Sequence, residues 1–233
     1  MTGTMPPKAF ISWSSGKDCA FAMVEARRLG LVEIVGALTT ISEAYDRVVQ
    51  HGTRSSVLDL QMEALGLPCL KVGLPSDCTM ALYEQRLTGA VESIKAQGVP
   101  SIVFGDLFLD DVRAGRDALL AHLGMGGIYP LWKHDTAALA GRMIDAGLTA
   151  HVVCLDPRQV PRDLIGRRFD RAFLRDLPPA VDPCGENGEF HTVVSAGPMF
   201  RHPIKAELGT VVERGGFVFA DLAAPPPVSA ERD

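Results

Sequence analysis

Short apolar runs alternate with longer amphipathic segments along the first two thirds of the chain. Six such runs are rich in branched or aromatic side chains, as buried strands are. They lie at residues 9–13, 33–40, 69–72, 101–104, 127–132 and 150–155. Between them, apolar positions recur at helical spacing and predict helices at residues 19–29, 53–65, 76–97, 110–123 and 135–146. Strands that alternate with helices of this length predict an α/β fold with a doubly wound parallel sheet.

The pattern changes after residue 157. A basic segment at residues 162–175 is predicted to be helical, and a polar, Gly-rich stretch follows at residues 182–192. Strand-like alternation then predicts a hairpin around Gly215-Gly216. We therefore expect a first domain at residues 1–130, a smaller C-terminal α+β domain at residues 131–222 and a disordered tail at residues 223–233.

Composition excludes several classes of protein. Among the 233 residues, 47% are hydrophobic and 22% are charged, which is typical of a globular protein with a large core. No apolar run approaches the roughly 20 residues of a membrane helix, and the N-terminus lacks a signal-peptide pattern, so a cytoplasmic protein is expected. The net charge of -5 argues against a general nucleic-acid binder. The five cysteines form no C-x-x-C pair, which favours neither a disulfide framework nor structural zinc.

Residues 14–18, SSGKD, form a turn between the first predicted strand and the first predicted helix; we call them the N-terminal loop. Gly16 allows close approach of a ligand to the backbone, and a helix start presents free N–H groups. Lys17 adds a positive charge, and Ser14 and Ser15 add hydroxyl groups. Asp18 stands where a helix N-cap is expected. This combination predicts a phosphate-binding loop, although an ordinary capped turn is the alternative.

The N-terminal loop differs from two common phosphate loops. A P-loop needs Gly where Ile11 stands, and the dinucleotide pattern G-x-G-x-x-G is absent here. The residues SSGKDC resemble instead the S-G-G-x-D-S loop of the N-type ATP pyrophosphatases, which cleave ATP between its α and β phosphates. Ser15 replaces a Gly of that pattern, and Cys19 replaces its last Ser with a poorer hydrogen-bond donor.

A second polar cluster occupies residues 184–192, CGENGEFHT; we call it the C-terminal turn. Glycines flank Glu186 and Asn187, which predicts a tight turn that holds polar groups outward. Glu189 and His191 are two residues apart at the start of a predicted strand, so their side chains are expected to face the same way. Such a cluster could hold Mg²⁺, bind a cationic substrate or transfer protons. A polar turn leading into an edge strand is the alternative interpretation.

Four segments together resemble one family. The N-terminal loop, GDLFLDDVRAGRD at residues 105–117, PLWKHD at residues 130–135 and the C-terminal turn resemble, in this order, the diphthine–ammonia ligases. The resemblance covers roughly residues 10–200 and implies the adenine nucleotide alpha hydrolase-like (HUP) fold. It implies that a substrate carboxylate attacks the α-phosphate of ATP, with Mg²⁺ on the pyrophosphate, and that ammonia then displaces AMP to form an amide. The family's acceptor is diphthine, a modified histidine of elongation factor 2.

The resemblance also implies which residues act. Contacts to the nucleotide are expected from the N-terminal loop, from strand ends and from the HGTR segment: Ser12, Ser14, Ser15, Gly16, Lys17, Asp18, Cys19, Thr39, Thr40, His51, Arg54, Gly105 and Asp106. Asp18 and Asp106 are the candidate Mg²⁺ ligands. The candidate catalytic residues are Lys17, Glu186, Asn187, Glu189 and His191, whose roles stay undivided. Asp156 ends another predicted strand and is expected at the same edge of the sheet. A solvated Arg54 at a helix start is as consistent with the sequence as a phosphate contact.

Alternatives from other classes stay open. A related enzyme that modifies tRNA would usually carry catalytic cysteines or C-x-x-C pairs and a basic face, and a non-catalytic regulator would bind the nucleotide without turnover. A glutaminase domain does not fit in this length, so ammonia would be free or delivered by a partner. The bias toward Arg and Ala is typical of a GC-rich, most often bacterial, genome, in which the acceptor would be a carboxylate other than diphthine. A homodimer also stays open.

Overall fold

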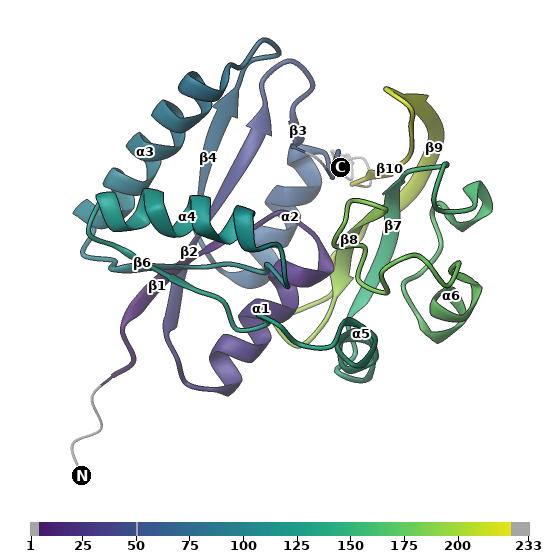
Figure 1. The fold of residues 1–233 in the computed structure, drawn as a ribbon, viewed down its shortest axis with the longest axis horizontal. Coiled ribbons are helices and arrows are strands. Elements are labelled where there is room, and N and C mark those ends of the chain that lie inside the picture. The colour runs from purple at the N-terminus through teal and green to yellow at the C-terminus, as the bar shows by residue number, and fades with distance from the viewer. Residues whose placement is uncertain (1–4, 50, 225–233) are drawn as a thin grey trace, which may run out of the picture.

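Two β-sheets organise the molecule, one from each half of the chain (Figure 1). The structure is a computed structural model that describes residues 5–49 and 51–224. The first sheet has the strand order β3-β2-β1-β5-β6, with β4 paired to β2. Its strands are β1 (Lys8–Ser12), β2 (Glu33–Ser42), β3 (Arg47–Val48), β4 (Cys69–Leu74), β5 (Ser101–Val103) and β6 (Gly126–Ile128).

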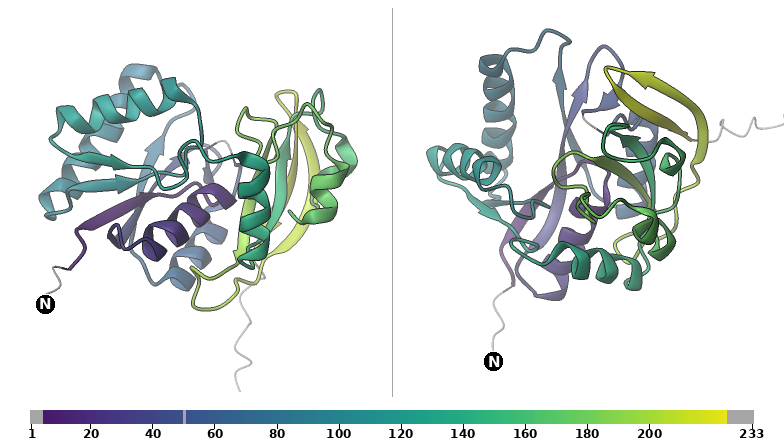
Figure 2. Two further views of the ribbon diagram at one scale, coloured as in Figure 1. Left: turned by 60° about the horizontal axis from the view of Figure 1, so that its bottom comes forward. Right: turned by 45° about the vertical axis from the view of Figure 1, so that its right-hand side comes forward.

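The first sheet is parallel except for the two-residue strand β3, which pairs antiparallel with β2. Four helices cover its two faces: α1 (Lys17–Arg28), α2 (Ser55–Leu65), α3 (Met80–Ala96) and α4 (Asp110–His122). Helices α3 and α4 lie on one face, and α1 and α2 lie on the other (Figure 2, left). The predicted doubly wound α/β fold is therefore confirmed. The chain continues on opposite sides of β1, toward β2 and β5, so a crevice is expected beyond the end of β1.

The second sheet is smaller and antiparallel, with the strand order β8-β7-β10-β9. It consists of β7 (Thr149–Leu155), β8 (Phe190–Ala196), β9 (Glu207–Arg214) and β10 (Phe217–Ala223). Beside it lie α5 (Thr136–Asp145), the 3₁₀ turn η1 (Arg162–Leu164) and α6 (Arg171–Asp176). The prediction that the run at residues 150–155 belongs to the parallel sheet is wrong, since it forms β7 of this antiparallel sheet. A short apolar run predicts a buried strand but does not reveal which strands it pairs with.

One hydrophobic core joins the two sheets. It contains Ile11 of β1 and Phe21 of α1 as well as Leu155 of β7 and Phe190 of β8, all nearly fully buried. A second core lies under α3 and α4 on the opposite face of the first sheet. The shared core fixes the two sheets against each other, so residues from both sheets can form one site between them. The domain boundary at residue 130 stays a prediction.

Several predicted boundaries are wrong at helix ends. The cap of α1 is Gly16 rather than Asp18, which lies in the first helical turn. Asp110 and Asp111 also lie in a first turn, where carboxylates favour the helix dipole, and Leu109 is the cap residue of α4. Helix α3 begins at Met80, because Thr79 caps it by accepting a hydrogen bond from the Leu82 N–H.

Two segments differ more from expectation. The basic stretch at residues 162–175 is not one helix, because residues between η1 and α6 run beside β7, where the Phe169 N–H donates to the Ala150 carbonyl oxygen. The tail expected from residue 223 begins with Ala223, which instead ends β10, and residues 225–233 lie outside the described part of the chain. No helix among the described residues has both the length and the apolar character needed to cross a membrane.

Candidate functional site

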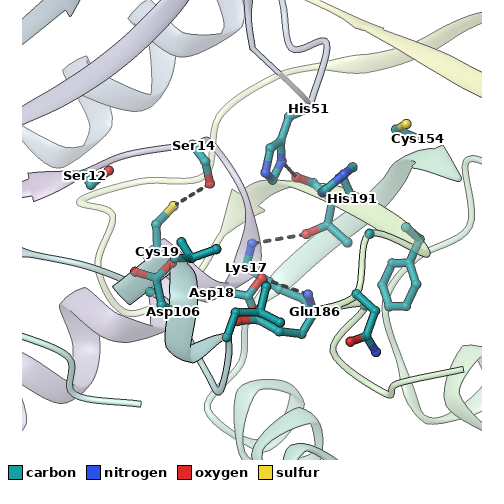
Figure 3. Close-up of a pocket in the computed structure, with 18 of the residues that line it drawn as sticks. Ser12, Ser14, Lys17, Asp18, Cys19, His51, Asp106, Cys154, Glu186 and His191 are labelled. Carbon is teal, nitrogen blue, oxygen red and sulfur yellow. Dashed lines mark hydrogen bonds and ion pairs between the residues drawn. The ribbon is translucent and has the colours of Figure 1, made fainter. Parts of the chain in front are cut away.

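A cavity of about 660 Å³ lies between the two sheets, beyond the ends of β1 and β5. Both sequence clusters contribute to its wall, although they are far apart in the chain. The predicted site residues that line it are Ser12, Ser14, Lys17, Asp18, Cys19, His51, Gly105, Asp106, Glu186, Asn187 and His191. Figure 3 shows Lys17, Asp18 and Glu186 close together, with His51 and His191 side by side above them. The structure therefore brings the N-terminal loop and the C-terminal turn to one place.

The backbone gives the N-terminal loop its shape. Ser15 has φ 73°, a left-handed conformation that glycine adopts more easily than serine does. The pyrophosphatase pattern has glycine at this position. The Ser15 carbonyl oxygen accepts a hydrogen bond from the Val194 N–H of β8. A Cβ atom on Gly16 would lie 2.5 Å from His51 Cε1 and 3.2 Å from the Thr192 carbonyl oxygen. A side chain at Gly16 would therefore press on the His51 ring and on the Thr192 backbone, because both halves of the chain pack against the loop.

Lys17 is buried at the contact between the two halves. Its Nζ donates to Asp18 Oδ2 at 3.0 Å and to the Cys184 carbonyl oxygen, and it lies 5.2 Å from the centre of the Phe190 ring. Burial acts to lower the pKa of the Lys17 ammonium, but the negative charge of Asp18 and other acidic neighbours outweighs burial and raises this pKa. Lys17 therefore provides a fixed positive charge in the cavity wall.

The thiol of Cys19 faces the backbone of the loop. Its Sγ donates to the Gly16 carbonyl oxygen at 3.1 Å and accepts from Ser14 Oγ at 3.5 Å. Burial raises the pKa of the thiol to about 11, so the thiol keeps its hydrogen at neutral pH. Because this hydrogen is already donated within the loop, Cys19 has none for a ligand.

Three carboxylates face the cavity in different electrostatic settings. Asp18 Oδ1 is buried and has no hydrogen-bond partner among the described residues. Asp106 Oδ1 accepts from Arg116 Nη2 at 3.1 Å, and Asp106 Oδ2 lies 2.8 Å from Arg116 Nε without the alignment of a hydrogen bond. Burial raises the pKa of Asp106, with Arg116 opposing it. Glu186 Oε1 accepts from the Leu107 N–H at 2.8 Å.

The pKa of Glu186 lies close to neutrality. Burial raises it from 4.5 to about 7, and the charges of Asp18 and Asp106 act in the same direction, while the Leu107 N–H and Lys17 oppose the rise. A carboxylate with such a pKa can accept and release a proton at neutral pH.

Glu189 takes a different place from Glu186. It is 1% exposed, is absent from the cavity wall and accepts three hydrogen bonds from Asn187 and from Asp182, which shortly precedes the turn. The donors are the Asp182 N–H at 3.0 Å, the Asn187 N–H at 2.9 Å and Asn187 Nδ2 at 3.1 Å. The expectation that Glu189 and His191 face the same way is wrong, because β8 begins only at Phe190 and strand alternation does not extend to Glu189.

Two histidines form the upper wall of the cavity. The ring centres of His51 and His191 are 4.8 Å apart, and His51 Nδ1 lies 2.9 Å from the Thr192 carbonyl oxygen, to which it donates. Burial lowers the pKa of both rings, that of His191 to about 3, with His51 and Lys17 adding to the effect. Both imidazoles are therefore neutral near pH 7 and serve as hydrogen-bonding groups rather than as acids.

Thr39 and Thr40 line a second cavity of about 980 Å³ between the first sheet and helices α3 and α4. Thr39 Oγ1 donates to the Trp13 carbonyl oxygen at 2.8 Å. The two cavities share part of their walls, and the shared residues are Ser12, Ser14, Phe104, Val112 and Arg116.

Arg54, Asp156 and Ser15 are not in the wall of either cavity. Arg54 Nε donates to Asp221 of β10 at 3.0 Å, and its side chain is 47% exposed. The Asp156 carboxylate accepts hydrogen bonds from Arg158, which hold its pKa well below the usual range. Ser15 is fully buried, and its Oγ has no partner among the described residues.

Several residues of the cavity wall had no role predicted from the sequence. Arg116 belongs to the motif at residues 105–117, which could have indicated it. Phe217 and Phe219 come from the C-terminal hairpin, and their place depends on how β10 pairs with β7, which no local pattern encodes. Within the described ranges, 5–49 and 51–224, no three or more His, Cys, Asp or Glu side chains are arranged to hold a metal ion.

Two family matches together include both sequence clusters of the site. Residues 7–126 match the family described as the diphthamide synthase N-terminal domain, and residues 135–216 match the diphthamide synthase C-terminal domain. The chain is also similar to a diphthine–ammonia ligase of Danio rerio, with 25% identity over 229 residues and 90% of each chain covered. The first match contains the N-terminal loop and Arg116, and the second contains the C-terminal turn.

Proposed function

The chain belongs to the diphthamide synthase family, and from this membership we propose that it is an ATP-dependent ligase that joins ammonia to a substrate carboxylate. The observation that carries the proposal is the meeting of the two clusters at one cavity. A helix N-terminus, Lys17 and Arg116 supply positive charge to the wall of this cavity, which Glu186, with a pKa near neutrality, also lines. Polyphosphate binding and proton transfer are thus available within one cavity.

In the first step, an oxygen of the acceptor carboxylate attacks the α-phosphorus of ATP. A bond from carboxylate oxygen to phosphorus forms, the bond from the α-phosphorus to its bridging oxygen breaks, and pyrophosphate leaves. The N-terminal loop and the start of α1 bind the β and γ phosphates through backbone N–H groups, and Lys17 supplies a full positive charge. The adenosine occupies the second cavity, where Thr39 and Thr40 line the wall.

Asp18 fits a magnesium ion better than Asp106 does. Asp18 Oδ1 is buried without a partner, so a cation carried on the phosphates would satisfy it. The Asp106 carboxylate instead lies against Arg116. Magnesium would neutralise charge on the departing pyrophosphate. A single carboxylate, rather than a cage of protein ligands, suits an ion that phosphate oxygens also bind.

In the second step, the ammonia nitrogen attacks the acyl carbon of the adenylate. The carbon–nitrogen bond forms, the bond from the acyl carbon to the phosphate oxygen breaks, and AMP leaves with the electron pair. The nitrogen must lose one proton, and we assign its acceptance to Glu186. Asn187 and the neutral His191 line the cavity and contact the acceptor, whereas Glu189 positions the turn through its three hydrogen bonds.

The acceptor is a carboxylate that the cavity between the sheets can admit. The Danio rerio relative is named for diphthine, so elongation factor 2 that carries diphthine is the first acceptor to test. The composition argues for another carboxylate if the source is bacterial. Both kinds of acceptor would react by the same two steps.

A label-transfer experiment tests this function. The protein is incubated with ATP, Mg²⁺ and ¹⁵N-ammonium, either with diphthine-bearing elongation factor 2 or with an extract of the source cells. Mass spectrometry should find one molecule that gains a single ¹⁵N in place of a hydroxyl group, and Glu186→Gln should form much less of it. ATP binding without any turnover under all these conditions would favour a regulator and contradict the proposal.

A further inference from the structure

Arg116 stands at the junction of the two cavities. It lies in helix α4, and its side chain is part of the wall of both the cavity at the N-terminal loop and the cavity at Thr39 and Thr40. The other residues shared by both walls carry hydroxyl or apolar side chains, so Arg116 is the cation of the shared wall among the described residues. A ligand that extends from one cavity into the other would pass along this shared wall, where Arg116 carries the positive charge.

Neighbouring groups hold the guanidinium in one orientation. Its Cζ atom lies 4.6 Å from the centre of the Phe104 ring, Nη2 donates to Asp106 Oδ1 at 3.1 Å, and Nε lies 2.8 Å from Asp106 Oδ2. These contacts use Nε and Nη2, and within the described residues no hydrogen bond is formed by Nη1. The side chain keeps 33% of its surface exposed. A restrained arginine with a free edge is suited to bind an oxyanion.

We propose that Arg116 binds the α-phosphate of ATP and steadies it during attack by the acceptor, an inference that rests on the proposed function. With adenosine in the second cavity and the β and γ phosphates at the N-terminal loop, the α-phosphate lies at the junction. The nonbridging oxygens of this phosphate gain negative charge as the fifth bond to phosphorus forms. A preoriented guanidinium stabilises that charge more than it stabilises bound ATP. In this arrangement Asp106 is a positioning residue that holds Arg116.

Arg113 provides a matched control one helical turn away. Its guanidinium lies 4.5 Å from the Tyr129 ring centre and 4.6 Å from the Trp132 ring centre, and it lines neither cavity. Both arginines thus belong to α4, carry the same charge and stack on aromatic rings. They differ in whether a ligand in the two cavities could touch them.

The test uses adenosine and AMP, which differ by the α-phosphate, and requires no acceptor. Calorimetry measures the affinity of the wild type, Arg116→Gln, Arg116→Lys and Arg113→Gln for adenosine, AMP and α,β-methylene-ATP. For Arg116→Gln we expect AMP and α,β-methylene-ATP to bind about tenfold or more weakly, the usual effect of losing a charge-assisted hydrogen bond, and adenosine to bind as before. Arg116→Lys should recover part of the affinity for AMP, and Arg113→Gln should bind all three ligands as the wild type does.

Other results would overturn the inference in distinguishable ways. If the wild type binds α,β-methylene-ATP and Arg116→Gln binds AMP as tightly as the wild type does, Arg116 does not bind the α-phosphate. The proposed function would then remain intact. An equal loss for adenosine and AMP would show that the arginine supports the cavity rather than the phosphate. A wild type that binds none of the three ligands would reject both the inference and the proposed function.

Discussion

The N-terminal loop and the C-terminal turn face the same cavity but are built in different ways. The loop depends on backbone geometry, with a left-handed Ser15 and a Gly16 that has no room for a side chain. The turn has left-handed glycines as well, Gly185 and Gly188, but side chains also tie it together. Glu189 accepts two hydrogen bonds from Asn187 and one from the Asp182 N–H, and Asp182 Oδ1 accepts from the Cys184 N–H. Two glutamates near each other in the sequence therefore have different roles: Glu186 lines the cavity, and Glu189 stabilises the turn through its hydrogen bonds.

The largest effect is expected where loop and turn meet, at Lys17. Lys17→Ala removes a buried cation and leaves the Asp18 carboxylate and the Cys184 carbonyl oxygen without their donor. We expect ATP to bind at least about 100-fold more weakly and the free energy of unfolding to fall by about 3 kcal/mol. Calorimetry and urea denaturation measure the two quantities. Lys71→Ala, which removes an exposed lysine paired with Asp59, is the control and should change neither one. Unchanged ATP affinity in folded Lys17→Ala would remove the N-terminal loop from the nucleotide site.

Glu189 should matter more for stability than for chemistry. Glu189→Ala leaves the Asp182 and Asn187 N–H groups without their acceptor, and we expect the free energy of unfolding to fall by about 2 kcal/mol. Glu189→Gln keeps one acceptor oxygen and should lose about half as much. Urea denaturation at one pH compares both variants with Glu186→Gln. If Glu189→Gln formed no amide yet unfolded like the wild type, Glu189 would belong to the reaction and the contrast with Glu186 would fail.

Glu186 also predicts how the stability of the protein depends on pH. The pKa of Glu186 rises from 4.5 in the unfolded chain to about 7 in the folded protein, so the folded state binds more protons between these values. The contribution of Glu186 to stability is therefore lost as pH rises from about 4.5 to about 7. Glu186→Gln should reduce the fall in stability between about pH 5 and about pH 8 by on the order of 1 kcal/mol. Urea denaturation at both pH values tests this, and an identical pH dependence in wild type and variant would place Glu186 in a more solvated setting.

Arg54 should show the smallest effect. Its guanidinium is half exposed and paired with Asp221, so Arg54→Ala should lower the free energy of unfolding by less than about 1 kcal/mol and leave ATP affinity unchanged. Calorimetry compares the ATP affinity of Arg54→Ala with that of the wild type. A tenfold loss of affinity would bring Arg54 back to the phosphates and widen the site beyond the two clusters.

The sequence predicted the elements of the first sheet and both clusters of the site well, since each depends on local patterns. Alternating apolar runs and amphipathic segments identify β1, β2, β4 and β5, and Gly66 ends α2 in the left-handed conformation that its position suggests. The place of the N-terminal loop after β1 follows from the same pattern. The meeting of loop and turn was expected only through the family resemblance.

The rest depended on contacts between distant segments. Nothing local shows that residues 149–155 pair antiparallel with β8 and β10, or that Phe217 and Phe219 reach the cavity. The inward turn of Glu189 depends on where β8 begins, and the ion pair of Arg54 depends on a strand near the other end of the chain. Arg116 gains its position from the way α4 packs over two cavities, which a single-helix pattern does not contain.

The most direct test of the two-part site follows the phosphorus atoms of ATP. Phosphorus NMR is recorded while the protein reacts with ATP, Mg²⁺ and ¹⁵N-ammonium in the presence of an acceptor that gains the label. We expect AMP and pyrophosphate in equal amounts, matched by the ¹⁵N amide formed. Release of ADP and phosphate would contradict attack at the α-phosphate, and with it the assignment of the N-terminal loop and the C-terminal turn to one ligase site.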